Sequence, residues 1–250
     1  PPSPPSPPLP PLAPLSPDFI YAASEDQLRS LIMDATADIS IYLPPRADFK
    51  LGSQISCTSY IKVTVASSGE GATLDGQEQT GLFYLWGGCS LTLRGLTLVN
   101  GRTGEGGGVV YASGAGDVEI IESVVRDCFA TYHGGVVYSS GSGAVSIIGS
   151  AVSGCSARDY GGATYTADTD LNVTDSTISG CNATFGGAVY VASGSARASL
   201  ARSTISSCIA TESGGGLYSA GGRTTLSDGT LISGCLAQEG RSVFLLAGEV

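Results

Sequence analysis

The sequence predicts an all-β protein, a parallel β-helix in which short strands stack coil upon coil along one axis. First, one motif occurs five times between residues 107 and 235, with copies that begin GGVVYASG, GGVVYSSG, GGATYTAD, GGAVYVAS and GGGLYSAG. Second, the cysteines that close the copies follow at steps of 27, 26, 27 and 27 residues, and a fixed period of this size is typical of a solenoid. Third, each period holds short runs rich in Val, Ile, Thr and Tyr, which indicate strands rather than helices.

Each period of about 27 residues contains three such strands, which in the second copy cover residues 136–138, 145–148 and 151–155. Three strands and three turns per coil build three sheets. Every strand then pairs with its equivalent one coil away, about 4.8 Å along the axis. Equivalent side chains are therefore expected to line up in columns.

Three apolar columns are expected to point inward and form the core. They are Val110, Val137, Thr164, Val189 and Leu217; Ile120, Ile147, Val173, Leu200 and Leu226; and Val125, Val152, Ile178, Ile205 and Ile232. Burying one such apolar side chain stabilises the fold by about 1.5–3 kcal/mol, so repeated columns can hold a glycine-rich chain together. A further column of small residues is expected at a corner: Ala130, Ala157, Ala183, Ala210 and Ala237.

The chain begins with a proline-rich arm, residues 1–17, which reads PPSPPSPPLPPLAPLSP. Such a run adopts extended polyproline II without internal hydrogen bonds and acts as a stiff linker. Residues 18–60 are expected to form an N-terminal cap. A helix is predicted over residues 24–36, with Ser24 as N-cap and Gln27 three residues on, and a strand over residues 39–43. This short helix would cover the open apolar end of the first coil.

The β-helix itself is predicted over residues 61–250, with less regular first coils. Strands are expected at residues 61–65, 72–74 and 82–85, then at 91–93, 96–98 and 109–111. The last predicted strand, residues 243–246, is followed by no polar capping helix. An uncapped end exposes strand edges and core, so we expect it to bind another subunit; the alternative is a truncated sequence.

The phrases ATLDG at residues 72–76 and LTLRGLTLVNG at residues 91–101, with the repeated coils, resemble the right-handed parallel β-helix, or pectin-lyase-like, superfamily. The resemblance covers residues 39–250 and implies a right-handed coil. The Gly-Gly-x-apolar-Tyr unit is also similar to the Gly-Gly-Ala-Ile repeats of polymorphic surface proteins and adhesins.

The Ser-Pro-Pro repeats of the arm resemble the extensin and pherophorin-like hydroxyproline-rich glycoproteins of plants and green algae. That resemblance implies that prolines of the arm are hydroxylated and carry short O-glycans. The candidate positions are Pro2, Pro4, Pro5, Pro7, Pro8, Pro10 and Pro11.

One aromatic column runs through the coils and is the main surface candidate for contact with a partner or a glycan. It consists of Tyr84, Tyr111, Tyr138, Tyr165, Tyr190, Tyr218 and Phe244. Because these residues alternate with the apolar column of Val110, we expect them on the outer face of the pleat; the alternative is that they stack inside. An outward ladder would offer a flat strip to sugar rings, a proline rod or another subunit, since proline segments dock on aromatic grooves.

The chain has seven cysteines. Five of them form an inward column: Cys128, Cys155, Cys181, Cys208 and Cys235. Neighbouring Cα atoms of this column would lie about 4.8 Å apart, which is within disulfide range. Because five cysteines cannot all pair, buried free thiols are expected. Cys57 and Cys89 each lie just before an equivalent strand of successive coils and can form a disulfide in an oxidising compartment. No metal site is expected, since a single histidine, His133, and no CxxC pair accompany the cysteines.

Two N-glycosylation sequons are present, at Asn172 and Asn182. Asn172 lies between the inward Leu171 and Val173, and Asn182 follows the inward Cys181. Both asparagines are therefore expected to face outward, where they are usable acceptors in a secreted protein.

Composition argues against several partners. The net charge of −10 does not suit a nucleic acid, no apolar run approaches the roughly 20 residues of a membrane helix, and no cofactor motif is present. The lack of a secretory signal fits a mature chain after cleavage.

Enzymes of the resembled superfamily use clustered carboxylates with His or Arg, or Asp-bound calcium. This sequence offers only one acidic pair, Asp168 and Asp170, without a matching base, so no catalytic residue is expected.

These observations favour an extracellular structural glycoprotein, secreted to the cell surface or cell wall, that is no enzyme. It would polymerise into a fibre through the open β-helix end and the proline arm. The alternative is a carbohydrate-binding or adhesive module that uses the aromatic column. A divergent polysaccharide lyase or hydrolase is the third hypothesis, and it needs paired carboxylates that the sequence does not supply.

Overall fold

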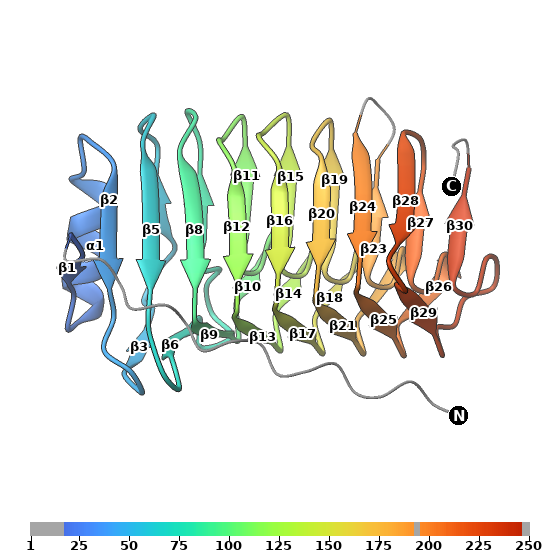
Figure 1. Ribbon diagram of the computed structural model, residues 1–250, viewed down its shortest axis with the longest axis horizontal. Coiled ribbons are helices and arrows are strands. Elements are labelled where there is room, and N and C mark those ends of the chain that lie inside the picture. The colour runs from blue at the N-terminus through green and yellow to red at the C-terminus, as the bar shows by residue number, and fades with distance from the viewer. Residues whose placement is uncertain (1–17, 193–195, 247–250) are drawn as a thin grey trace.

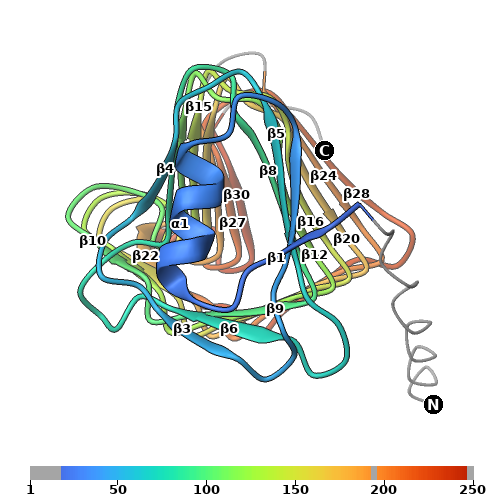
Figure 2. The same cartoon turned by 90° about the vertical axis from the view of Figure 1, so that its left-hand side faces the viewer.

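The computed structural model describes residues 18–192 and 196–246 and shows a right-handed parallel β-helix of about eight turns, with roughly 27 residues per turn. Strands stand side by side along the long axis, and coils follow one another in sequence order (Figure 1). Viewed along the axis, the coils superpose on a triangular section (Figure 2). The predicted fold class is confirmed.

Sheet A forms one side of the triangle and has nine strands, all parallel. They are β1 (Ile20–Tyr21), β2 (Ile39–Tyr42), β5 (Lys62–Ala66), β8 (Ser90–Arg94), β12 (Val118–Ile121), β16 (Val145–Ile148), β20 (Leu171–Thr174), β24 (Arg197–Ala201) and β28 (Arg223–Ser227).

Sheets B and C form the other two sides, with eight strands each. Sheet B contains β3 (Asp48–Lys50), β6 (Ala72–Asp75), β9 (Leu96–Val99), β13 (Val124–Arg126), β17 (Ala151–Ser153), β21 (Thr177–Ser179), β25 (Thr204–Ser206) and β29 (Leu231–Ser233). Sheet C contains β4 (Ile55–Cys57), β7 (Phe83–Leu85), β11 (Val110–Ser113), β15 (Val137–Ser140), β19 (Thr164–Ala167), β23 (Val189–Val191), β27 (Leu217–Ser219) and β30 (Val243–Leu245).

A fourth, narrow sheet D lies between sheets B and C, in a lobe that projects from the triangle (Figure 2). Its strands are β10 (Arg102–Thr103), β14 (Phe129–Ala130), β18 (Ser156–Ala157), β22 (Asn182–Phe185) and β26 (Ile209–Ser213). The sequence predicts only a corner here, marked by its alanine column. Four of those alanines, Ala130, Ala157, Ala183 and Ala210, are buried within these short strands.

The three apolar columns pair in register and are buried as predicted. Val110 pairs with Val137, Ile120 with Ile147, and Val125 with Val152, and the pairing continues through the later coils. Thr164 takes its place among the valines with no exposed surface. The columns end at Leu226 and Ile232, which are partly buried in the last coil.

The helix α1 (Glu25–Met33) lies across the N-terminal end of the triangle (Figure 2). Its N-cap is Ser24, whose Oγ accepts the Gln27 N–H at 3.3 Å, while Gln27 Oε1 accepts the Ala23 N–H at 2.8 Å. Leu28 and Ile32 are buried against the core, so the predicted capping role agrees with the packing, although the helix is shorter than residues 24–36.

Candidate functional site

The predicted aromatic column lies on the outer face of sheet C. Strand register pairs each tyrosine with the next, from Tyr84 on β7 to Phe244 on β30. The alternating residues, such as Val110, are buried, whereas the aromatic residues are half-buried, apart from Tyr218 at 8% exposure. We call this row the tyrosine ladder: Tyr84, Tyr111, Tyr138, Tyr165, Tyr190, Tyr218 and Phe244.

The rings of the tyrosine ladder stack face to face along the axis. Successive centroids are 5.1, 4.8, 5.3, 5.5, 4.9 and 5.0 Å apart, and the ring planes diverge by at most 18°. Neighbouring rings therefore cover each other's faces, and the ladder presents ring edges and phenol hydroxyls to solvent. The sequence suggests a flat strip that could stack on sugar rings, but in this stack the ring faces are covered by neighbouring rings.

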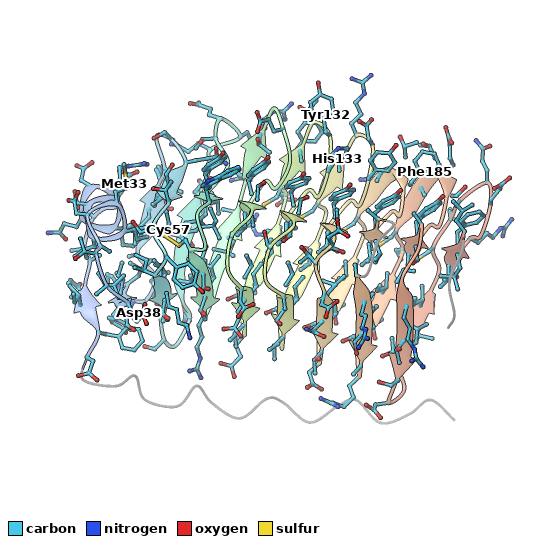
Figure 3. The ribbon with its side chains drawn as sticks, turned by 90° about the horizontal axis from the view of Figure 1, so that it is seen from above. Met33, Asp38, Cys57, Tyr132, His133 and Phe185 are labelled. Atoms are coloured by element: carbon cyan, nitrogen blue, oxygen red, sulfur yellow. A yellow bond between two sulfur atoms is a disulfide. The ribbon has the colours of Figure 1, made fainter. Side chains whose placement is uncertain are left out.

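A second aromatic row packs against the ladder on the side of sheet D. It consists of His133, Tyr160 and Phe185, which pair coil to coil through isolated β-bridges. The His133 ring centroid lies 4.8 Å from that of Tyr165, and the Tyr160 centroid lies 4.7 Å from that of Tyr190. Figure 3 shows His133 and Phe185 along the same side of the molecule. This row covers one edge of the ladder and leaves the other edge free.

Sequence reasoning missed the second row, although its signal is present. Each member directly precedes a Gly-Gly pair, and the first glycine of each pair has positive φ. At Gly134, with φ +61°, an added Cβ would lie 2.1 Å from the Val137 carbonyl oxygen; at Gly135 it would lie 2.2 Å from the Gly162 oxygen of the next coil. Glycine is therefore required where the chain folds His133 back onto the ladder.

Burial makes four phenols of the ladder weaker acids. It raises the pKa of Tyr111, Tyr165 and Tyr218 above the ordinary value, and that of Tyr190 to about 12, with neighbouring phenols adding to the effect. Burial lowers the pKa of His133, which the nearby Asp159 carboxylate partly offsets. These four hydroxyls therefore keep their protons at neutral pH, and the His133 ring is neutral there.

A lane of small residues runs beside the free edge of the ladder, also on the outer face of sheet C. Its members stand two residues after a ladder tyrosine: Ser113, Ser140 and Ala167 within β11, β15 and β19, and Ala192 and Ala220 directly after β23 and β27. The lane begins next to Trp86, which is 52% exposed, and ends next to Leu246, which is 64% exposed. None of the five lane residues is charged.

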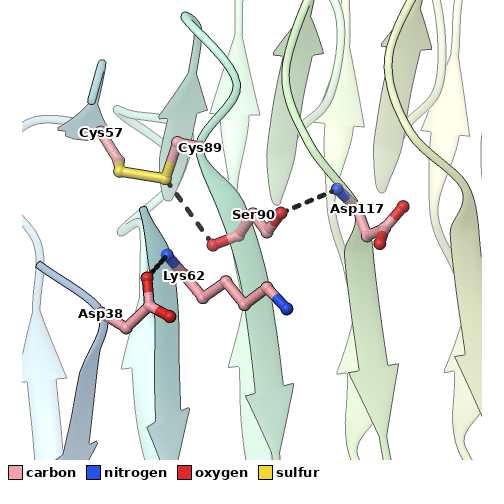
Figure 4. The surroundings of a disulfide bond; sticks show 6 residues. All are labelled: Asp38, Cys57, Lys62, Cys89, Ser90 and Asp117. Carbon is pink, nitrogen blue, oxygen red and sulfur yellow. Dashed lines mark hydrogen bonds between the residues drawn. A yellow bond between two sulfur atoms is a disulfide. The ribbon is translucent and has the colours of Figure 1, made fainter. Parts of the chain in front are cut away.

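Cys57 and Cys89 are joined by a disulfide, with Cα atoms 6.0 Å apart and a sequence separation of 32 residues (Figure 4). The bond links two successive coils at the start of the solenoid, the pairing that the sequence singles out. Beside it, Asp38 Oδ1 accepts the Lys62 N–H at 2.8 Å, and Ser90 Oγ accepts the Asp117 N–H at 3.1 Å. In these two coils, the side chain at the equivalent position thus bonds the backbone of the next coil.

The five cysteines of the inward column are free and buried. Each thiol donates to the carbonyl oxygen two residues before it, as in Cys181 to Ser179 at 3.5 Å. Contact with the neighbouring thiol, followed by burial, raises the pKa of Cys155 and Cys181 far above its ordinary value. These thiols pack as small apolar groups.

Both sequon asparagines lie on outward positions. Asn172 is half-buried on β20, between the buried Leu171 and Val173, and Asn182 is exposed on β22. The Thr184 hydroxyl of the second sequon donates to the Arg158 carbonyl at 2.7 Å. The proline candidates Pro2 to Pro11 lie outside the described residues.

The acidic residues are placed as turn formers. Asp127, Asp168, Asp175 and Asp228 all have positive φ, between 49° and 58°. Asp168 and Asp170 border a shallow hollow of 460 Å³ together with Arg197, and Asp170 Oδ1 accepts the Arg197 N–H at 2.8 Å.

A larger hollow of 610 Å³ lies between α1 and β1, with Tyr21, Leu31 and Asp38 among its lining residues. Over residues 18–192 and 196–246, no three His, Cys, Asp or Glu side chains group in a way that could hold a metal ion. Within the same ranges, no helix has the length and apolar character needed to cross a membrane.

Comparison with known proteins finds no match to this chain among protein-family models, curated proteins or solved structures.

Proposed function

We propose that this protein is a secreted structural glycoprotein, a rod-like subunit of an extracellular fibre or cell-wall assembly. The observation that carries the proposal is the register of the coils in sheet C, where the ladder from Tyr84 to Phe244 continues without a gap; sheet D shifts its register between Ala183 and Phe185. A solenoid of this kind is stiff along its axis, because each coil hydrogen-bonds only to its neighbours over the whole length.

The extracellular location is supported by three separate features. A disulfide joins Cys57 and Cys89, which fits an oxidising compartment. Asn172 and Asn182 stand on outward positions where a glycan can be accommodated. The Ser-Pro-Pro arm resembles the hydroxyproline-rich segments of extensin and pherophorin-like wall proteins, which supports O-glycans on the prolines as well.

Assembly is proposed to use the last coil and the proline arm. In the part of the last coil that the structure describes, Leu231, Leu236 and Leu246 are each at least half exposed. At the other end, α1 covers the core, so the last coil of one subunit cannot continue directly onto the first coil of the next. Contact through these exposed leucines, with arms reaching neighbouring subunits, is the arrangement that these surfaces favour.

Expression of the chain in a plant or algal secretory host tests this function. Intact-mass analysis of the secreted protein should show glycans that shift on Asn172→Gln and Asn182→Gln, and hydroxylated prolines in residues 1–17. Electron microscopy and sedimentation should show assemblies larger than one chain. A monodisperse, unmodified monomer would refute the proposal.

A carbohydrate-binding module remains the second candidate, favoured by two exposed aromatic rings at the start of the ladder. Trp86 is 52% exposed and Tyr60, packed over Gly88, is 89% exposed, so both have free ring faces that the stacked tyrosines lack. Glycan-array binding by a monomer, lost on Trp86→Ala but kept on Tyr138→Phe, would support this candidate instead.

A further inference from the structure

We propose that the free edge of the tyrosine ladder, with the lane of small residues beside it, binds a polyproline II chain, and that its occupant is the proline-rich arm, residues 1–17, of a second copy. The inference rests on the proposed function, since it names the contact by which subunits of the assembly would meet.

The chemistry of the ladder edge suits a chain that offers only hydrogen-bond acceptors. Proline lacks an N–H, and the carbonyl groups of polyproline II make no internal hydrogen bonds. The hydroxyls of Tyr138, Tyr165 and Tyr190 make no hydrogen bond to another described residue. Burial raises the pKa of Tyr165 and Tyr190, so these two phenols keep their protons at neutral pH. A row of phenol donors beside apolar ring edges therefore complements a row of carbonyl acceptors beside proline rings.

The repeat of the ladder matches the repeat of the ligand. Polyproline II turns once in three residues of about 3.1 Å each, so equivalent positions recur every 9.3 Å or so. Coils of a parallel sheet follow at about 4.8 Å, so every second tyrosine recurs at about 9.6 Å. The arm has its own three-residue repeat, Pro-Pro-Ser or Pro-Pro-Leu, which would present the same face to every second ring. The lane contains only Ser and Ala, and these small side chains leave room for proline rings next to the tyrosines.

The length of the arm is sufficient for this contact. Six steps of the ladder span about 29 Å. In polyproline II this distance takes about nine residues, whereas the arm has seventeen and would extend to about 53 Å. About eight residues then remain to connect the bound part to the coil of their own subunit.

Position and charge favour the arm of a second copy. The described chain begins beside β1, at the edge of sheet A, whereas the ladder lies on sheet C, another side of the triangle (Figure 2). A polyproline II segment stays extended over several residues, so returning around the end to its own ladder would require it to bend. Two chains of net charge −10 repel each other, and a contact between an uncharged arm and an uncharged lane avoids the acidic surfaces.

The test uses the full chain and a fluorescent synthetic peptide of residues 1–17. Titration followed by fluorescence anisotropy should show saturable binding. Tyr138→Phe combined with Tyr165→Phe keeps the stacked rings, as Phe244 already does within the ladder, and removes two donors, so binding should weaken about tenfold or more. Tyr21→Phe, on an exposed ring of sheet A, is the matched control and should leave the affinity unchanged. A peptide with Pro4→Gly, Pro7→Gly and Pro10→Gly should bind more weakly, because glycine removes the preformed helix.

Energy transfer between donor-labelled and acceptor-labelled full chains examines the second copy directly. It should rise with concentration and fall when unlabelled peptide is added in excess. Unsaturable peptide binding, equal affinity of the double variant and wild type, or energy transfer that the peptide leaves unchanged would overturn the inference. If secreted, glycosylated chains assemble equally well with the double variant, the inference fails while the proposed structural function stands.

Discussion

Two corners of each coil use the same backbone bend but different side chains. At the corner between sheets A and B, a residue with positive φ precedes Ser123, Ser150, Ser176, Ser203 and Thr230, which we call the serine column. At the corner between sheets B and D, a residue with positive φ precedes each cysteine of the inward column. In both columns the side chain donates to the carbonyl two residues before it, except that Thr230 donates to Ser227, three residues before.

The two columns differ in what they accept. Ser176 Oγ donates to the Thr174 carbonyl at 2.8 Å and accepts the Ser150 N–H of the preceding coil at 3.1 Å. The Cys181 thiol donates to the Ser179 carbonyl at 3.5 Å, and its contact with the backbone N–H of Cys155 in the preceding coil is weaker, because sulfur is a poor acceptor. The serine column therefore fixes one coil to the next through directional bonds, whereas the cysteine column mainly fills space. The buried Thr164 hydroxyl, which has no hydrogen-bond partner among the described residues, is a third case to compare with these two columns.

The largest effect is expected from Ser176→Ala. This change removes the acceptor of a buried N–H, and an unsatisfied buried group costs about 1–3 kcal/mol in addition to the lost hydroxyl bond. The free energy of unfolding should fall by about 2–3 kcal/mol in urea denaturation. Ser179→Ala, on the outer face of β21, is the control and should change it little.

Cys181→Ala should cost less, about 1–2 kcal/mol, because only packing and weak sulfur hydrogen bonds are lost. The same denaturation measurement checks this value. A loss as large as that of Ser176→Ala would show that the cysteine column holds the register as firmly as the serine column, which contradicts the comparison.

Thr164→Val should stabilise the protein, since the buried Thr164 hydroxyl has no hydrogen-bond partner among the described residues. Valine has nearly the same shape and already fills this column at Val137 and Val189. A gain of about 1 kcal/mol is expected from thermal or urea unfolding. The reverse change, Val137→Thr, should lower stability, and a stabilising Val137→Thr would contradict the argument.

The smallest effect is expected from His133→Phe, and it depends on pH. Burial lowers the pKa of His133 in the folded state, and its Nδ1 atom has no partner in the described chain. As the pH falls through the unfolded-state pKa of about 6.5, the unfolded chain binds the proton first, so the free energy of unfolding falls. His133→Phe, which imitates Phe185 two coils away, should remove this decline. Unfolding measured at pH 7.5 and pH 5 should show wild type losing more stability than the variant.

The sequence was sufficient for the fold because two independent periods agree. The two-residue alternation around Val110 separates inside from outside, and the 27-residue period sets the register that pairs Tyr111 with Tyr138. Sheet D was not predicted as strands because several of its members have only two residues, too few to show alternation. The serine column has the same period as the cysteines, but serine is so common in turns that its register conveys little by itself.

The candidate site could be predicted only in part. The ladder and its outward face follow from the repeat, but the orientation of the rings does not, because it depends on how neighbouring phenols pack. The second row requires a turn that brings His133 back over Tyr165, and nothing in local propensity shows that fold-back. The residue before each Gly-Gly pair is the signal that would have revealed it.

The in-register stacking also determines how such a molecule can change in size. Steps between ladder tyrosines range from 25 to 28 residues, so loops absorb small differences in length without disturbing the columns. Tandem duplication of one 27-residue unit would lengthen the rod by about 4.8 Å and leave the packing of all the remaining coils unchanged. Evolution can therefore adjust the length of this molecule in steps of one coil.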